Sequence, residues 1–187
     1  MKFVKSQMPN LFHYLTVVTH NRFPVFLSDK ACQLLVDAIL RAKEKYPFKL
    51  VGYVIMPDHL HLLINPFDQN ISAVMKQIKG AAAHEILEWM RSRETEPSLA
   101  KLKLNSPQKR AHQYALWLKE FFPVELWSLK FIQQKLQYIH NNPVRAGLCA
   151  HPADWKWSSY RAYFPHEPGS VPLDIDWQAY WKELPKV

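Results

Sequence analysis

The chain has 187 residues, 48% of them apolar, and its 24 Lys and Arg against 16 Asp and Glu give a formal net charge of +8. This length allows one substantial core, and the positive charge favours a polyanionic partner such as nucleic acid. No apolar run approaches the length that spans a bilayer, and the first residues lack the apolar centre of a signal peptide. We therefore expect a cytoplasmic protein with no membrane partner.

The first two predicted elements are a strand and a helix. Residues 11–19 are rich in aromatic and β-branched side chains, which favour a strand, and a turn is expected around residues 21–24. Ser28 is then suited to cap a helix, because apolar residues recur at helical spacing from there to about Lys45.

A hairpin with two histidines beside its turn is the most informative local feature. Residues 48–66 predict two antiparallel strands joined by a Pro-Asp turn, in which Asp58 serves the turn or orients His59. Positions i and i+2 of a strand share one face, so His59 and His61 would point the same way. Such a pair suits a metal ion, although two exposed histidines explain the pair equally well when it is taken alone.

A long helix, a fourth strand and a final helix are predicted in the second half of the chain. Residues 71–90 carry apolar side chains at helical intervals. Residues 115–126 favour a strand or hairpin, with Pro123 at an edge or a break. Ser128 is suited to cap the final helix, which Pro143 is expected to end. The order strand, helix, strand, strand, helix, strand predicts an α+β fold, a ferredoxin-like split βαβ antiparallel sheet with helices on one face.

Two polar residues near the end of the final predicted helix are four positions apart. If the helix persists to Asn142, the phenol of Tyr138 and the amide of Asn142 lie on one face. His140 falls on a different face, where we expect it either to be solvated or to lie behind the residues that form the site, with no catalytic role. Plain structural roles stay open: Tyr138 as a core tyrosine with a surface hydroxyl, and Asn142 as a residue that ends the helix.

Two ordered motifs identify a family. Residues 56–63 read Met-Pro-Asp-His-Leu-His-Leu-Leu, and residues 138–148 read Tyr-Ile-His-Asn-Asn-Pro-Val-Arg-Ala-Gly-Leu. The chain that contains them resembles the single-tyrosine HUH transposases, especially the group associated with repetitive extragenic palindromes (REP). Supporting similarity runs through residues 14–22 and 154–160, so the resemblance covers roughly residues 11–163.

Three parts of the chain depart from that family pattern. Residues 91–114 are charged and polar and predict an insertion, and the tail after about residue 163 has no counterpart. Phe122 stands where the family often has a histidine, so no role is transferred to it. We expect one domain over residues 1–187, with the insertion at about 91–114.

The resemblance implies a metal-dependent tyrosine transposase. Tyr138, on a C-terminal catalytic helix, would attack the scissile phosphate and form a 5'-phosphotyrosine link, leaving a free 3'-hydroxyl. His59, His61 and Asn142 would hold Mg²⁺ or Mn²⁺, which polarises the phosphate as a Lewis acid. Because one phosphodiester is exchanged for another, the reaction needs no nucleotide hydrolysis, and the chain has no Gly-x-x-x-x-Gly-Lys motif.

The partner implied by the resemblance is single-stranded or hairpin DNA. Basic and aromatic side chains together suit such a ligand, and the candidates are Lys76, Lys79, Arg145, Trp155, Lys156, Trp157 and Arg161. The alternative for the two tryptophans is that at least one closes the core. A monomer and a homodimer both stay open.

Two other functions also stay open. A non-catalytic module that binds single-stranded nucleic acid would not need His59, His61 and Tyr138 together. A metal-dependent phosphodiesterase that uses water would need the histidines but not Tyr138.

Overall fold

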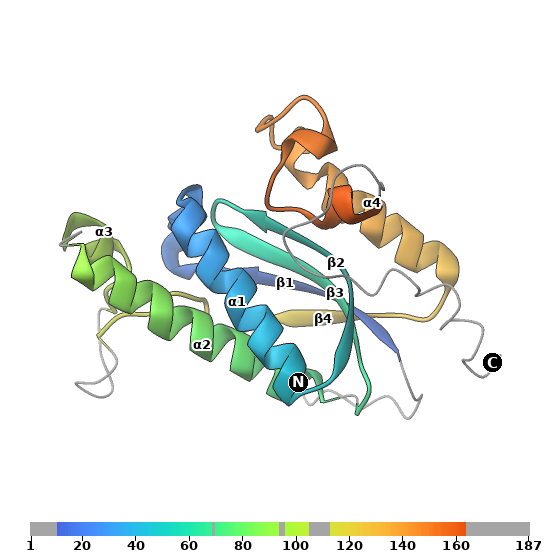
Figure 1. The fold of residues 1–187 in the computed structure, drawn as a ribbon, viewed down its shortest axis with the longest axis horizontal. Coiled ribbons are helices and arrows are strands. Elements are labelled where there is room, and N and C mark those ends of the chain that lie inside the picture. The colour runs from blue at the N-terminus through green and yellow to red at the C-terminus, as the bar shows by residue number, and fades with distance from the viewer. Residues whose placement is uncertain (1–10, 69, 94–95, 105–112, 164–187) are drawn as a thin grey trace.

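A four-stranded antiparallel sheet forms the centre of the molecule (Figure 1). The computed structural model describes residues 11–68, 70–93, 96–104 and 113–163. The sheet order is β2-β3-β1-β4, so β2 and β4 are its edges. The strands are β1 (Phe12–Val18), β2 (Phe48–Met56), β3 (His59–Pro66) and β4 (Phe122–Leu126).

Helices cover the two faces of the sheet unequally (Figure 1). Two long helices pack on one face and enclose the larger core, while the other face holds a smaller core under a single helix. Together with the sheet they give the predicted order of elements, so the ferredoxin-like α+β fold is confirmed. The helices on the first face are α1 (Asp29–Lys45) and α2 (Ile71–Ser92). The short helix α3 (Glu96–Lys101) follows α2 in the chain. The helix on the second face is α4 (Leu129–Arg145).

The chain after α4 returns to the free edge of β2. The backbone N–H of Ile55 donates to the carbonyl of Trp157 over 2.8 Å, and the N–H of Tyr53 donates to Oγ of Ser159 over 2.9 Å. This segment satisfies backbone groups that an uncovered edge strand would leave without partners. It also anchors the last described residues against the sheet.

A glycine allows α4 to approach β2 closely. A Cβ atom added at Gly52 would lie only 2.6 Å from Cδ1 of Leu136, a residue of α4. Gly52 also sits at the irregularity in the pairing of β2 with β3. The missing side chain therefore helps to fix the distance between α4 and the sheet.

The expected end of α4 was wrong. Pro143 lies inside the helix, which continues to Arg145 and closes at Gly147, where φ is +70°. The N–H of Gly147 donates to the carbonyl of Val144, and this left-handed closure suits glycine. Pro143 costs one intrahelical hydrogen bond, but it is buried, and packing of this turn compensates for the loss.

The predicted fourth strand was too long. Only residues 122–126 form β4, and upstream of it Trp117 makes an isolated bridge to Thr19. The insertion predicted at about 91–114 stays a prediction, because residues 94–95 and 105–112 lie outside the described residues. The single domain also stays a prediction, and the tail from 164 to 187 lies outside the described residues as well. No helix in the described ranges is both long and apolar enough to cross a membrane.

Candidate active site

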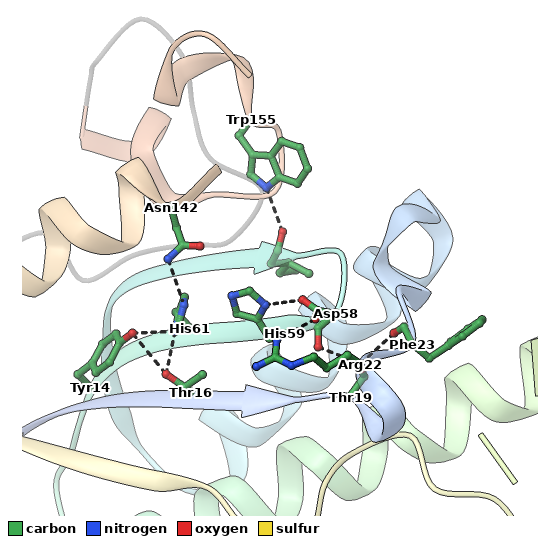
Figure 2. Close-up of polar contacts among 11 residues, drawn as sticks. Tyr14, Thr16, Thr19, Arg22, Phe23, Asp58, His59, His61, Asn142 and Trp155 are labelled. Atoms are coloured by element: carbon green, nitrogen blue, oxygen red, sulfur yellow. Dashed lines mark hydrogen bonds and ion pairs between the residues drawn. The ribbon is translucent and has the colours of Figure 1, made fainter. Parts of the chain in front are cut away.

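The strand β3 places both histidines on the face of the sheet that carries α4. His61 is directly opposite Thr16 in the pairing of β3 with β1, and His59 is opposite Val18. The ring centroids of His59 and His61 are 4.8 Å apart, while Leu60 between them is buried in the core on the opposite face. The predicted convergence of the two imidazoles is thus present (Figure 2).

The ring of His61 is held from both of its nitrogens. Nδ1 lies 2.8 Å from the hydroxyl of Tyr14 and 2.9 Å from Oγ1 of Thr16, and Nε2 lies 3.3 Å from the side-chain nitrogen of Asn142. An amide N–H can only donate, so Nε2 is the acceptor and Nδ1 carries the proton. Burial, and then the charge of neighbouring His59, lowers the pKa of His61 to about 3. His61 is therefore neutral at pH 7, with a lone pair on Nε2.

Asp58 orients the second histidine. Its Oδ1 lies 2.6 Å from Nδ1 of His59, and its Oδ2 accepts from Arg22 over 3.1 Å. Burial raises the pKa of the Asp58 carboxyl, but the hydrogen bonds and charges of His59 and Arg22 outweigh it, so the pKa is lowered overall. The carboxylate thus accepts a hydrogen bond from Nδ1–H and leaves Nε2 of His59 free to bind a ligand. Asp58 serves the turn and orients His59 as well.

Helix α4 brings the tyrosine and the asparagine to the histidines. Ser128 caps the helix, because its side chain accepts from the N–H of Phe131. The ring of Tyr138 is 5.6 Å from that of His61 between centroids, and Asn142 lies one turn further on. The structure therefore brings together all four residues predicted for catalysis and metal binding.

Two cations flank the ring of Tyr138. The ammonium of Lys135 lies 5.7 Å from the centroid of that ring and 4.7 Å from that of Tyr14, and the guanidinium carbon of Arg145 lies 5.4 Å from the ring of Tyr138. Arg145 was among the predicted DNA-binding residues, whereas Lys135 was missed. Its position three residues before Tyr138 on the same helix was the available signal.

Of the two positions expected for His140, the structure contradicts the solvated one. Its ring is buried, and Nε2 lies 2.8 Å from Oγ of Ser159, with the rings of Tyr160 and Tyr163 packed edge-on against it. Burial lowers its pKa to about 4. The expectation failed because the chain after α4 folds back over this face of the helix. His140 instead helps to fasten that segment to α4.

The donor set near the histidines fits a divalent ion. Within the described ranges no three His, Cys, Asp or Glu gather into a metal-binding group, and the amide of Asn142 is the candidate third donor that lies against His61. Rotating that amide by half a turn presents its oxygen to the place where its nitrogen now lies. Two imidazole nitrogens and one amide oxygen are a donor set that suits Mg²⁺ or Mn²⁺ when phosphate oxygens complete the coordination.

The lysines predicted on α2 lie away from this site. Helix α2 packs on the opposite face of the sheet from α4 (Figure 1). Lys76 is exposed there, while the ammonium of Lys79 donates to the backbone carbonyls of Leu118 and Lys119. The structure does not bring these two lysines to the histidines.

The predicted residues near the end of the described chain make internal contacts. Trp157 is buried and donates through Nε1 to Asp29, which confirms the expectation that at least one tryptophan closes the core. Lys156 also pairs with Asp29, over 2.7 Å. The indole N–H of Trp155 donates to the carbonyl of Ile55 (Figure 2), and Nε of Arg161 donates to that of Ala153. A DNA-binding role for these four side chains stays a prediction.

Comparison with known proteins identifies the family. The model of the family described as "Transposase IS200 like" matches residues 8–142, which include both histidines, the tyrosine and the asparagine. The chain belongs to the IS200-like transposase family. The family predicted from residues 56–63 and 138–148 is thus confirmed, and with it the predicted class of enzyme.

Two relatives and one solved structure resemble this IS200-like transposase. A Haemophilus influenzae protein assigned as a REP-associated tyrosine transposase is 25% identical over 150 residues, covering 79% of this chain and 78% of the relative. The REP-associated tyrosine transposase of Escherichia coli K12 is 24% identical over 149 residues, covering 79% and 74%. A solved REP-associated tyrosine transposase bound to a REP hairpin has the same fold, with a TM-score of 0.65, 20% identity and coverage of 94% and 93%.

Proposed function

We propose that this IS200-like transposase cleaves and rejoins single-stranded DNA through a covalent bond to Tyr138. The observation that carries the proposal is the position of this phenol, on α4, against the ring of His61 on β3, with 5.6 Å between ring centroids. A non-catalytic module has no need for this juxtaposition. A hydrolase that uses water has no need for a tyrosine beside its histidines.

His59, His61 and Asn142 are the proposed holders of a divalent ion, Mg²⁺ or Mn²⁺. Both imidazoles would present Nε2 to the ion, because Nδ1 of His59 is held by Asp58 and Nδ1 of His61 lies against the hydroxyls of Tyr14 and Thr16. When bound, the ion would supply Lewis acidity toward the scissile phosphate. The protein's contribution would be a pair of oriented nitrogen donors, to which a half-turn of the Asn142 amide adds an oxygen donor.

Tyr138 is the proposed nucleophile. Its oxygen forms a bond to phosphorus as it gives up its proton, and the bond from phosphorus to the 3'-oxygen breaks. The products are a 5'-phosphotyrosine and a strand whose 3'-oxygen takes up a proton. Lys135 and Arg145, both within 6 Å of the ring centroid, favour the negative charge that develops on the phenol and on the phosphate.

Single-stranded or hairpin DNA is the proposed substrate. The two relatives are REP-associated transposases, and a solved protein of this fold is bound to a REP hairpin. The net charge of +8 supports a polyanionic ligand, and Arg145 is an exposed cation beside the nucleophile. Among the predicted DNA-binding residues, Arg145 has the strongest structural support.

The test is formation of a covalent adduct. The protein is incubated with 5'- and 3'-labelled single-stranded DNA from the repeats that flank its gene, with and without Mg²⁺ or Mn²⁺, and resolved under denaturing conditions. We expect a metal-dependent adduct to the 5' side of the break in the wild type and none in Tyr138→Phe. Tyr46→Phe, which alters a tyrosine between α1 and β2, is the matched control and should leave the adduct unchanged. Cleavage without an adduct would instead favour the phosphodiesterase, and binding alone the non-catalytic module.

A further inference from the structure

A band of exposed apolar side chains extends across the sheet from the histidines toward β4. Thr16 pairs with His61 on one side and with Phe122 on the other, so these three residues form one row on the same face. Phe122 is 67% exposed, and Val124, next along that face of β4, is 44% exposed. Two strand spacings put the backbone of Phe122 roughly 10 Å from that of His61.

Helix α4 continues the band. Phe131, Lys135 and Tyr138 follow one another at spacings of four and three residues, so they lie along one side of the helix. Phe131 is 39% exposed, and its ring meets that of Trp127, 63% exposed, edge-on at 5.4 Å between centroids. Lys135 thus lies between the exposed ring of Phe131 and the proposed nucleophile, Tyr138, along this side of α4.

Among the described residues, three of the four exposed Phe and Trp rings belong to this band, the fourth being Phe67, whereas Trp117 and Trp157 are buried in the core. Rings left in solvent beside a reactive site indicate a ligand with flat apolar parts. The cations Lys135 and Arg145 lie on the same side of α4, so the ligand should also carry negative charge. Nucleobases on a phosphate backbone have both properties, because bases stack on aromatic rings while phosphates meet ammonium and guanidinium groups.

We propose that Phe122, Trp127 and Phe131 form a stacking surface for the bases of the single strand that flanks the scissile phosphate, with Lys135 contacting a phosphate between the surface and Tyr138. This inference rests on the proposed function for the position of the scissile phosphate. The separation of roughly 10 Å puts Phe122 within reach of the first nucleotides beside the break, and Phe131, in contact with Trp127, lies two helical turns before Tyr138 on α4. Bases would be held by stacking, so the surface tolerates any sequence.

A second copy of the chain is the competing occupant, since β4 is an edge strand. Features of β4 disfavour pairing with another strand. It is only five residues long, and Pro123 lacks the N–H that a ladder needs. Glu125 adds a charge to the edge. These are the devices by which edge strands avoid pairing, so a nucleic acid lying across the ring faces is favoured.

The experiment compares bases with abasic residues in the flanking strand. Labelled oligonucleotides carry the cleavage sequence with either normal or abasic nucleotides at the first few positions on each side of the break, and dissociation constants are measured by fluorescence anisotropy. For the wild type we expect abasic residues on one side to weaken binding about tenfold. Trp127→Ala and Phe131→Ala should each weaken binding of the normal oligonucleotide by a similar factor. In these two variants, replacing the bases by abasic residues should raise the dissociation constant little further. Phe67→Ala, an exposed phenylalanine after β3, is the matched control and should behave as the wild type.

The outcomes separate this inference from the proposed function. Unchanged affinity in Trp127→Ala and Phe131→Ala, with adduct formation at Tyr138 intact, would overturn the stacking surface alone. Loss of the abasic effect in these variants would support it even if no adduct formed. A wild-type dimer that dissociates in Trp127→Ala by sedimentation velocity would assign the surface to a second copy and overturn the inference. The abasic comparison on the wild type needs no variant and so does not depend on the stability of one.

Discussion

At the scale of single residues, the proposed metal site depends on which nitrogen of each histidine carries the proton. Asp58 accepts from Nδ1–H of His59, and the amide N–H of Asn142 donates to Nε2 of His61, so both Nε2 atoms keep a lone pair. Partners of this kind hold a ring in its ligating orientation and strengthen it as a donor. The residues behind the histidines should therefore matter almost as much as the histidines.

Asp58→Asn tests this dependence. An amide in place of the carboxylate removes the negative charge that His59 and Arg22 contact. Because an amide can both donate and accept, the new side chain would no longer fix the proton on Nδ1 of His59. We expect Mn²⁺ affinity to fall about 10- to 100-fold, measured by isothermal titration calorimetry in the presence of single-stranded DNA. Adduct formation should recover partly at high Mn²⁺. The control Asp37→Asn alters a half-buried aspartate on α1, away from the histidines, and should bind Mn²⁺ as the wild type does. Equal affinities for Asp58→Asn and the wild type would show that the aspartate serves the turn alone.

The sequence allowed the four candidate residues to be chosen but not their supporting contacts. Strand periodicity paired His59 with His61, and helical periodicity paired Tyr138 with Asn142. The placement of Thr16 opposite His61 depends on the register between β1 and β3, which no local pattern specifies. Lys135 was missed because a lysine on an amphipathic helix looks like any solvated charge until the tertiary structure sets it over two tyrosine rings.

At the scale of elements, the position of α4 on the sheet decides whether Tyr138 meets the histidines. The helix was predicted from its cap and periodicity, but two of its features were not. Pro143 lies within the helix because burial of this turn compensates for a lost hydrogen bond, and His140 is buried because a later segment covers it. Both depend on packing between parts of the chain that are far apart in sequence, which local propensity does not report.

Gly52→Val should separate α4 from the sheet. Its Cβ would lie 2.6 Å from Cδ1 of Leu136, and the two further methyl groups make simple rotation of that leucine insufficient. We expect the free energy of unfolding to fall by about 1–3 kcal/mol. The adduct at Tyr138 should fall more than tenfold under conditions in which the variant is still folded. Urea unfolding and the adduct assay measure the two effects.

A second glycine provides the control for that substitution. Nothing lies within 4 Å of a Cβ atom added at Gly80, which is in the middle of α2. Gly80→Ala should therefore stabilise the protein by about 1 kcal/mol, the difference in helix propensity, and leave the adduct unchanged. If Gly52→Val kept full activity, α4 would have to hold Tyr138 in place without close contact at β2.

At the scale of the whole molecule, the two faces of the sheet have different tasks. Helices α1 and α2 cover one face and bury its residues in the larger core (Figure 1). The other face is only partly covered by α4, which leaves the histidines, Tyr138 and the exposed side chains of Phe122 and Val124 on the uncovered part. The fold order could be predicted because hydrophobic periodicity follows this division. The extent of the sheet surface that α4 leaves uncovered could not be predicted, because it depends on how far this one helix reaches across the four strands.

The same burial that builds the sheet makes the stability of the protein depend on pH. His13 in β1 is buried, its Nδ1 has no hydrogen-bond partner within the described part of the chain, and burial lowers its pKa to about 4. Below about pH 6.5 the unfolded chain takes up a proton that folded His13 does not accept until about pH 4, so the free energy of unfolding falls as the pH falls through this range. One such histidine contributes a slope of up to about 1.4 kcal/mol per pH unit. His61 and His140, also buried with lowered pKa values, act in the same direction.

Replacing His13 by Gln isolates its share of that dependence. The variant has no proton to gain, so its free energy of unfolding, measured by urea unfolding at pH 7, 6, 5 and 4.5, should fall less steeply than that of the wild type, by up to about 1.4 kcal/mol per pH unit. His84→Gln, at an exposed position on α2, should follow the wild type. Parallel curves for His13→Gln and the wild type would mean that His13 is protonated equally in the folded and unfolded states, which its burial without a partner at Nδ1 argues against. A difference between the two free energies of unfolding that appears only below pH 6.5 would show that His13, on the sheet face covered by α1 and α2 and away from the candidate site, limits the stability of the protein in acid.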